Sequence, residues 1–233
     1  MKLVITRPRL DAEPLAQKIL ALGHQVVVAP VLEIVARENV EIPKRAFQAV
    51  CVTSANSLRC LTAPIDFAIP VLAVGEQSAA AARAFGFANI TAQGGDVHGL
   101  VKYILSHIDP KAGPLLYISG AETSGDLEGQ LRQSGYDVTR VISYDAIPQN
   151  LLPFRAEIES SSGVLLYSPR SAKLWQKQIE LLNLTEKMAD MAHFCLSLQV
   201  ASIISQNSHI VIAKAPSEDA MLTLLQRRIG DRA

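Results

Sequence analysis

An internal repeat limits the possible folds of this chain more than any other pattern: segment 115–147 follows the pattern of segment 3–34. Each copy contains an apolar strand, a polar turn, an amphipathic helix that stops at a glycine, and a second strand. A similarity at a fixed offset indicates that one structural unit is built twice. We therefore expect two related lobes. The matched positions lie 112 residues apart and include Leu15 with Leu127, Gly23 with Gly135, and Val26 with Val138.

Strands alternate with helices along the whole sequence, which predicts an α/β fold with parallel sheets. Ten strands could form one continuous sheet, but the repeat and two polar segments favour two five-stranded sheets, each with helices on both faces. The middle segment holds five strands, so the two N-terminal strands must join the three C-terminal ones. The predicted organisation is a discontinuous first lobe of 1–35 plus 155–233, a second lobe of 46–143, linkers at 36–45 and 144–154, and a cleft between the lobes.

The composition argues against several classes of protein. The 22 basic residues balance the 22 acidic ones, whereas nucleic-acid-binding domains are usually basic. No apolar run is long enough to cross a membrane, and the first residues do not form a signal peptide. The three cysteines lack metal-ligand spacing, and so few are typical of a reducing compartment. Because 49% of the residues are hydrophobic, the chain can form a core alone, and we expect a cytoplasmic monomer.

Ligands of open parallel sheets bind beyond the carboxyl ends of the strands, where the strand order reverses. The turns expected at these ends are rich in Ser, Thr, Asn, Gln and Gly, and each is followed by a helix. In the first lobe the candidate binding residues are Thr6, Arg7, Ser168, Arg170, Ser171, Ser197 and Gln199. In the second lobe they are Ser54, Asn56, Ser57, Gln77, Ser78 and Gly120.

Helix N-termini at these turns would suit a ligand with many anionic groups. Backbone N–H groups at helix starts bind carboxylates or phosphates without net positive charge. Several such starts around one cleft could hold a polyanion. The alternative is that the Ser and Asn side chains only cap their own helices. The pattern alone leaves both interpretations open.

Tyr144 is the candidate catalytic residue. We expect it to end the last strand of the second lobe, where its phenol could donate a hydrogen bond or a proton to a leaving group. The alternative is a tyrosine that packs at a domain junction. Other motifs do not occur: there is no GxGxxG after the first strand, no GxSxG elbow and no set of spaced metal ligands. Gly120 and Gly125 have phosphate-loop spacing, but Asp126-Leu127 replaces the Lys-Ser/Thr pair.

Short segments along the whole chain resemble the uroporphyrinogen-III synthase family. Each segment is short, so their order and spacing carry the resemblance. Ser78 and Gln199-Val200 depart from the family pattern, since threonines are common there. The segments are 4–8 (VITRP), 52–56 (VTSAN), 73–77 (AVGEQ), Gly120, 141–144 (VISY), 167–172 (YSPRSA) and 195–201 (CLSLQVA).

The resemblance implies two flavodoxin-like lobes joined by a two-stranded linker. It also implies a lyase that removes water from hydroxymethylbilane and closes the ring with inversion of ring D, giving uroporphyrinogen III for haem biosynthesis. No cofactor and no metal is implied, and the partner would be this small linear tetrapyrrole polycarboxylate. The alternative is a non-catalytic, two-lobed binding or sensory module for a small polyanion. Stoichiometric ligand binding without turnover would identify such a module.

Overall fold

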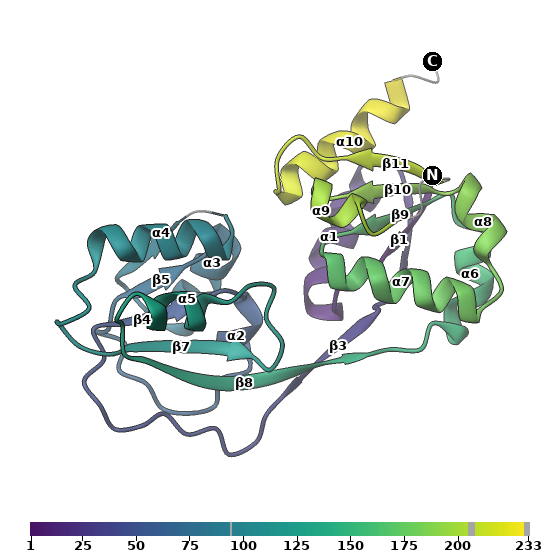
Figure 1. Ribbon diagram of the computed structural model, residues 1–233. Coiled ribbons are helices and arrows are strands. Elements are labelled where there is room, and N and C mark those ends of the chain that lie inside the picture. The colour runs from purple at the N-terminus through teal and green to yellow at the C-terminus, as the bar shows by residue number, and fades with distance from the viewer. Residues whose placement is uncertain (94, 205–207, 231–233) are drawn as a thin grey trace. The chain divides into compact units, whose positions relative to one another are not determined.

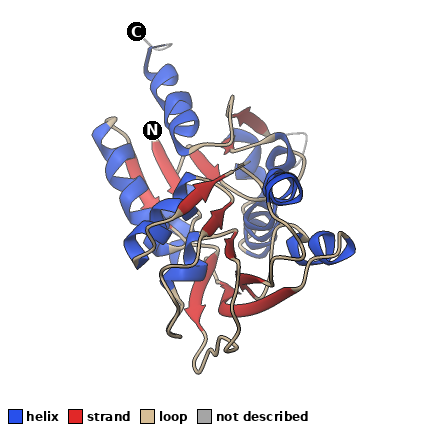
Figure 2. Cartoon of the chain, turned by 90° about the vertical axis from the view of Figure 1, so that its left-hand side faces the viewer, coloured by secondary structure: helices blue, strands red, loops and turns tan. Residues whose placement is uncertain are grey.

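The strands form two separate sheets, as the repeat predicts, and not one continuous sheet (Figure 1). The computed structural model describes residues 1–93, 95–204 and 208–230. The chain divides into unit 1, which comprises Met1–Glu33 and Ile147–Ala233, and unit 2, which comprises Ile34–Ala146. Figure 2 shows helices and strands in the mixture expected of an α/β protein. No described helix has both the length and the apolar character needed to cross a membrane.

The sheet of unit 1 has five parallel strands in the order β11-β10-β9-β1-β2. The two N-terminal strands pair with the three C-terminal ones, which confirms the predicted exchange. Val4 on β1 lies opposite Val27 on one side and Val164 on the other. The strand bounds are β1 Lys2–Ile5, β2 Gln25–Val28, β9 Gly163–Leu166, β10 Ala192–Cys195 and β11 His209–Ile212.

Helices cover both faces of this sheet. Leu3, Ile5 and Phe194 belong to a core that also includes Leu15 of α1 and Met221 of α10. Helices α7 and α9 contact β9 and β10, respectively. The helices are α1 Arg9–Ala21, the 3-10 helix η1 Leu152–Phe154, α6 Arg155–Glu159, α7 Pro169–Leu181, α8 Thr185–Asp190, α9 Leu198–Ala201 and α10 Glu218–Gly230.

The sheet of unit 2 has the order β3-β8-β7-β4-β5-β6, in which the strands from β8 to β6 are parallel. These five reproduce the order of unit 1, as the repeat requires. The sixth strand, β3, pairs with β8: the Arg37 N–H donates to the Ser143 carbonyl and the Gln149 N–H to the Val31 carbonyl, so these two strands run antiparallel. The bounds are β3 Leu32–Ala36, β4 Ala49–Val52, β5 Val71–Ala73, β6 Ile90–Ala92, β7 Leu115–Gly120 and β8 Val138–Pro148.

Successive residues of the central strands face opposite layers of helices. On β4, Val50 and Val52 join the core that includes Leu58 of α2 and Ala82 of α3. Ala49 and Cys51 join the core beneath the other two helices. The helices are α2 Ala55–Arg59, α3 Glu76–Phe85, α4 Val97–His107 and α5 Leu127–Gln133.

Strand β8 is longer than the sequence pattern indicated. It continues to Pro148, so Tyr144 lies within the strand. The prediction that Tyr144 ends the strand is therefore wrong. The extension exists because β3 supplies backbone partners beyond the point where β7 stops. The end of the predicted linker 144–154 forms η1, and α6 follows directly after it.

Candidate functional site

The turns that follow parallel strands gather at one edge of each sheet, because the carboxyl ends of those strands coincide there. The candidate binding residues lie on these turns or directly after them, except Gly120, which ends the strand before its turn; one set belongs to each unit. Helices α1, α7 and α9 follow the turns of unit 1, and helices α2, α3 and α5 follow those of unit 2. The turns begin at Thr6, Tyr167 and Leu196 in unit 1, and at Thr53, Val74 and Ala121 in unit 2.

Thr6 uses its hydroxyl inside the protein. The side chain is fully buried, and the hydroxyl donates a hydrogen bond of 2.8 Å to the carbonyl oxygen of Leu165 on β9. A buried hydroxyl with its partner satisfied contributes roughly 1 kcal/mol to stability. Thr6 therefore fixes the first turn to the neighbouring strand.

Arg7 lies at the centre of an ion-pair cluster in unit 1. Its side chain is 11% exposed, and its Nη atoms lie 3.2 Å from carboxylate oxygens of Asp11 and Glu218. The guanidinium carbon lies 4.7 Å from the ring centroid of Tyr167, in cation–π geometry. Burial raises the pKa of the Tyr167 phenol, whose oxygen has no hydrogen-bond partner in the described part of the chain. Arg7 thus stabilises the junction of β1, β9 and α10.

Ser168 and Ser171 lie together at the start of α7. The Ser168 hydroxyl oxygen accepts the Ser171 N–H at 3.0 Å and lies 2.8 Å from the Ser171 hydroxyl oxygen. Pro169 occupies the first position, where its missing N–H has no consequence for the helix. Arg170 follows and is partly exposed. The capping interpretation of Ser168 is therefore confirmed.

Ser197 has the same local role at the start of α9. Its hydroxyl oxygen accepts the Val200 N–H at 3.4 Å, which is a long cap bond. The side chain of Gln199 is exposed on the first turn of this helix. Gln199 is therefore open to solvent at the carboxyl edge of the unit 1 sheet.

The turn after β4 holds three candidate residues of unit 2. Ser54 caps α2 by accepting the Asn56 N–H at 3.3 Å. The Asn56 side-chain oxygen accepts a hydrogen bond of 3.1 Å from Arg59. Ser57 is fully buried, and its hydroxyl has no partner among the described residues. The Ser57 carbonyl accepts a 2.7 Å bond from the hydroxyl of Ser143, which connects α2 to β8.

Helix α3 starts without a side-chain cap. Its N-cap residue is Gly75, which has no side chain that could accept a first-turn N–H. Gln77 is exposed on this turn, whereas Ser78 is only 4% exposed. The start of α3 therefore leaves backbone donors available to an external acceptor more readily than a Ser-capped helix does.

Gly120 and Tyr144 are brought into contact where the pairing of β7 with β8 shifts register. Ser119 pairs with Ile142, but the next residue, Gly120, pairs with Tyr144, so β8 contains one extra residue there. The Ala121 N–H donates to the Tyr144 carbonyl oxygen at 2.9 Å. The Tyr144 side chain is 7% exposed and packs against Gly120, where a Cβ atom would meet the ring. The phenol thus lies beside the turn that follows β7.

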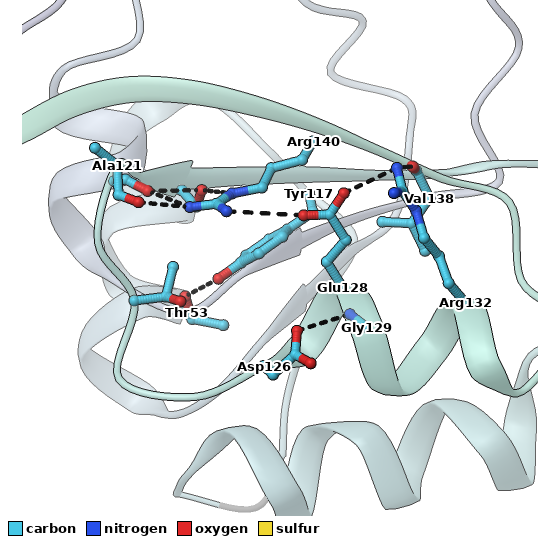
Figure 3. A network of polar contacts seen from close by, with 12 residues as sticks. Thr53, Tyr117, Ala121, Asp126, Glu128, Gly129, Arg132, Val138 and Arg140 are labelled. Carbon is cyan, nitrogen blue, oxygen red and sulfur yellow. Dashed lines mark hydrogen bonds and ion pairs between the residues drawn. The ribbon is translucent and has the colours of Figure 1, made fainter.

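Arg140, which no sequence motif singled out, organises this turn (Figure 3). Its Nε donates to the Ser119 hydroxyl at 2.8 Å, and its Nη2 donates to the carbonyl oxygens of Gly120 and Ala121 at 2.8 and 2.9 Å. Its Nη1 lies 3.7 Å from a carboxylate oxygen of Glu128. An arginine between Val138 and Val141 on a strand is a signal that the sequence did offer, because a charge in such a strand requires partners.

Tyr117 connects β7 to the turn after β4. It is 1% exposed, and its hydroxyl lies 3.0 Å from the hydroxyl of Thr53 (Figure 3). Burial raises the pKa of the Tyr117 phenol, although the bond to Thr53 and the charge of Arg140 act in the opposite direction. The phenol is therefore a neutral structural link between two turns.

Other features of the described residues do not coincide with these turns. No group of three or more His, Cys, Asp and Glu side chains among them could hold a metal ion. An open hollow of about 440 Å³ lies between α4 and α5, bordered by His98, Lys102 and Gln133 among others. It contains none of the candidate residues. The candidate site is therefore identified by the polar residues at the strand ends and not by this hollow.

Comparisons with known proteins agree with this architecture. One solved structure, a mutant uroporphyrinogen III synthase of Thermus thermophilus, has a TM-score of 0.60 and 13% identity, with 99% of each chain covered. Another, uroporphyrinogen-III synthetase of Helicobacter pylori, has a TM-score of 0.64 and 16% identity, covering 97% of this chain and 99% of that one. At such identities the likeness shows the fold. No curated protein sequence matches the chain.

A model of a protein family also matches most of the chain. The model described as uroporphyrinogen-III synthase HemD matches residues 13–223. That range extends from α1 to α10 and so includes strands of both sheets and the turns described above, except the first one, which follows β1. The chain belongs to the uroporphyrinogen-III synthase family.

Proposed function

We propose that this protein converts hydroxymethylbilane into uroporphyrinogen III by loss of water, ring closure and inversion of ring D. The observation that carries the proposal is the family match over residues 13–223. Two parallel sheets of the same strand order, each with helix-opening turns at its carboxyl edge, support it. No observation favours a non-catalytic binding module over the enzyme.

The reaction requires control of conformation more than acid–base chemistry. A pyrrole nitrogen of the substrate can expel the hydroxyl group, and the free substrate closes spontaneously to the type I isomer. The enzyme must hold the chain so that the substituted carbon of ring D is attacked. Holding the reacting atoms in a near-attack arrangement is worth roughly 7–11 kcal/mol. The reaction involves no net oxidation or reduction, so we propose that it proceeds without a redox cofactor.

We propose that backbone N–H groups at helix starts bind the carboxylates of the substrate. The first turns of α7 and α3 are suited to this role because both helices are long enough to develop a dipole. Gln77, Arg170 and Gln199 are exposed or partly exposed at these edges and would add side-chain contacts. The buried candidates would act indirectly, by holding the turns in shape: Thr6, Asn56, Ser57, Ser78, Gly120 and Ser171.

The remaining polar candidates have mixed roles in this proposal. Ser54, Ser168 and Ser197 cap their helices and so leave the other first-turn donors to the substrate. Arg7 already binds two carboxylates of the protein. A substrate carboxylate would have to share Arg7 with these partners. We therefore propose that Arg7 contributes positive charge near the unit 1 turns and does not bind the substrate directly.

Tyr144 is the proposed catalytic residue. Its phenol would donate a hydrogen bond, or a proton, to the departing hydroxyl group. The contact with Gly120 supports this role, because it holds a tyrosine side chain beside a substrate-facing turn. We also propose a cytoplasmic monomer that binds no nucleic acid. The zero formal charge argues against nucleic acid, the hydrophobic content allows a core without a partner, and the three cysteines are typical of a reducing compartment.

Separation of the product isomers tests the function directly. Purified protein is mixed with freshly prepared hydroxymethylbilane, and the uroporphyrinogens are oxidised and resolved by chromatography. We expect type III product, formed faster than the spontaneous reaction forms type I. Type I product alone, at the rate seen without protein, would reject the proposal. Stoichiometric binding of the substrate without turnover would identify the binding-module alternative.

A further inference from the structure

Arg140 and Tyr144 bond to opposite sides of one peptide group, the one that joins Gly120 to Ala121. Nη2 of Arg140 donates to the Gly120 carbonyl oxygen at 2.8 Å. The N–H of the same peptide, on Ala121, donates to the Tyr144 carbonyl oxygen at 2.9 Å. A trans peptide is planar, with its C=O and N–H pointing in opposite directions. The two bonds together therefore fix the direction in which the C=O and N–H of this peptide point.

The other contacts of Arg140 hold the neighbouring atoms of the same turn. The guanidinium donates to the Ser119 hydroxyl at 2.8 Å and to the Ala121 carbonyl at 2.9 Å. A guanidinium is planar and presents its donors in a fixed fork, so it sets the relative positions of these acceptors. Its side chain is 25% exposed, and charge-assisted hydrogen bonds with limited access to water are strong ones. Figure 3 shows these bonds converging on the turn.

The Tyr144 ring depends on the same turn. A Cβ atom on Gly120 would lie 2.6 Å from Cζ and 2.9 Å from the hydroxyl oxygen of Tyr144, so the ring and its hydroxyl lie directly over the glycine. The main chain of Tyr144 is held by the Ala121 N–H, and its ring is held by the surface of Gly120. Both restraints therefore pass through the peptide that Arg140 orients.

We propose that Arg140 is a positioning residue: it fixes the Gly120–Ala121 peptide and thereby places the Tyr144 phenol for the departure of the hydroxyl group. This inference rests on the proposed function and on the role proposed there for Tyr144. A displacement of a reacting group by 1 Å lowers a rate by about 100-fold. Loss of Arg140 should therefore lower kcat and leave KM nearly unchanged.

The test compares Arg140→Gln and Arg140→Lys with Arg132→Gln as the matched control. Arg132 also pairs with Glu128, at 2.8 Å, and also donates to a backbone carbonyl, that of Val138, but its bonds do not reach the turn after β7. We expect Arg140→Gln to lower kcat for type III product by about 10- to 100-fold. Arg140→Lys should recover part of the loss, because an ammonium group keeps the charge without the fork. Arg132→Gln should keep the wild-type kcat.

A double-mutant cycle with Tyr144→Phe tests whether Arg140 acts through Tyr144. If it does, the double variant should be no slower than the slower single variant, because the effects of coupled residues do not add. Circular dichroism verifies folding; if Arg140→Gln does not fold, Arg140→Lys replaces it in every comparison. If Tyr144→Phe has no measurable turnover, two other results test the positioning role. These are a loss in Arg140→Gln that falls on kcat and not on KM, and the partial recovery of kcat in Arg140→Lys.

Three results would overturn the positioning role: a wild-type kcat in both Arg140 variants, an equal loss in Arg132→Gln, or rate losses that multiply in the double variant. A wild-type kcat in Tyr144→Phe would also overturn it, because Arg140 would then have nothing to position. Failure of the proposed function is distinguishable from all of these, since the wild-type protein itself would then form no type III product.

Discussion

The Tyr144 ring packs so closely on Gly120 that a Cβ atom at position 120 would lie 2.6 Å from ring atom Cζ. Gly120→Ala should therefore displace the ring or separate β7 from β8. We expect the free energy of unfolding to fall by about 1–3 kcal/mol, as in other overpacked sites, and turnover to fall with it. Gly75→Ala is the stability control: its nearest contact would be an ordinary 3.9 Å, so it should lose less stability, only the smaller amount that an alanine N-cap costs α3. Urea denaturation measures the free energy of unfolding of both variants. Equal stability of Gly120→Ala and Gly75→Ala would contradict the close contact between Gly120 and Tyr144.

Removal of the Tyr144 hydroxyl should impair turnover without loosening the fold. We expect Tyr144→Phe to lower kcat by about 100-fold and to leave the thermal melting temperature almost unchanged, because the ring stays in place. The matched control is Tyr136→Phe. The Tyr136 hydroxyl donates to the Ile108 carbonyl at 2.6 Å, so this variant should lose roughly 1 kcal/mol of stability and keep its kcat. Wild-type kcat in Tyr144→Phe would make Tyr144 a packing residue.

Ser168→Asp separates helix capping from substrate binding. Aspartate is as good an N-cap as serine, so the melting temperature should be nearly constant. The new charge would repel a substrate carboxylate at the start of α7, and a repulsion of about 1 kcal/mol raises KM roughly fivefold. Ser217→Asp makes the same change at α10, where the Ser217 hydroxyl accepts the Ala220 N–H, and should leave KM as it is. An unchanged KM in Ser168→Asp would place the substrate elsewhere.

His193 should make unit 1 sensitive to acid. The ring is fully buried, and the backbone groups of Met191 and His209 raise its pKa less than burial lowers it. Burial lowers the pKa of His193 from 6.5 to about 4. Above pH 6.5 the ring is neutral in both states. As the pH falls towards 4, only the unfolded chain binds the proton, so the free energy of unfolding decreases by up to about 3 kcal/mol.

Replacement of His193 by a residue of similar size tests this pH dependence. His193→Leu should be at least as stable at pH 7 and should lose less stability than the wild type between pH 6.5 and 4. The exposed His98 provides the control, since His98→Gln removes a histidine without altering the core. Chemical denaturation at a series of pH values measures the effect. Parallel stability profiles of His193→Leu and the wild type would contradict it.

The two-sheet architecture could be predicted because its signals are local and occur twice. Each copy of the repeat carries a buried apolar strand and a helix that stops at a glycine. Gly23 and Gly135 have φ of +80° and +87°, a region that residues with a Cβ atom rarely adopt. Since parallel strands need long connections, the chain order then left few ways to complete each sheet. Because the middle segment already holds five strands, the two N-terminal strands had to join the three C-terminal ones.

The network around Tyr144 could not be predicted in the same way. The shift of register between β7 and β8 depends on one extra residue in a strand, and no turn residue or break in periodicity marks it. Arg140 is four positions from Tyr144 in sequence, yet the connection between them passes through β7. The pairing of β3 with β8, which moves Tyr144 away from a strand end, could not be predicted either. Within the described residues, the only partner of β3 in its sheet is β8, which lies about 100 residues later in the chain.

Local sequence patterns were enough to predict the two lobes, the exchange of strands and the edges at which polar turns collect, because periodicity and glycine stops act over a few residues. Tertiary structure alone decided which polar groups the protein keeps for itself. The Thr6 hydroxyl bonds to a carbonyl 159 positions away, and Arg7 pairs with Glu218 at a separation of 211. Partners so distant in sequence meet only after the strands have paired, so local patterns cannot distinguish a group that binds the substrate from one that stabilises the fold.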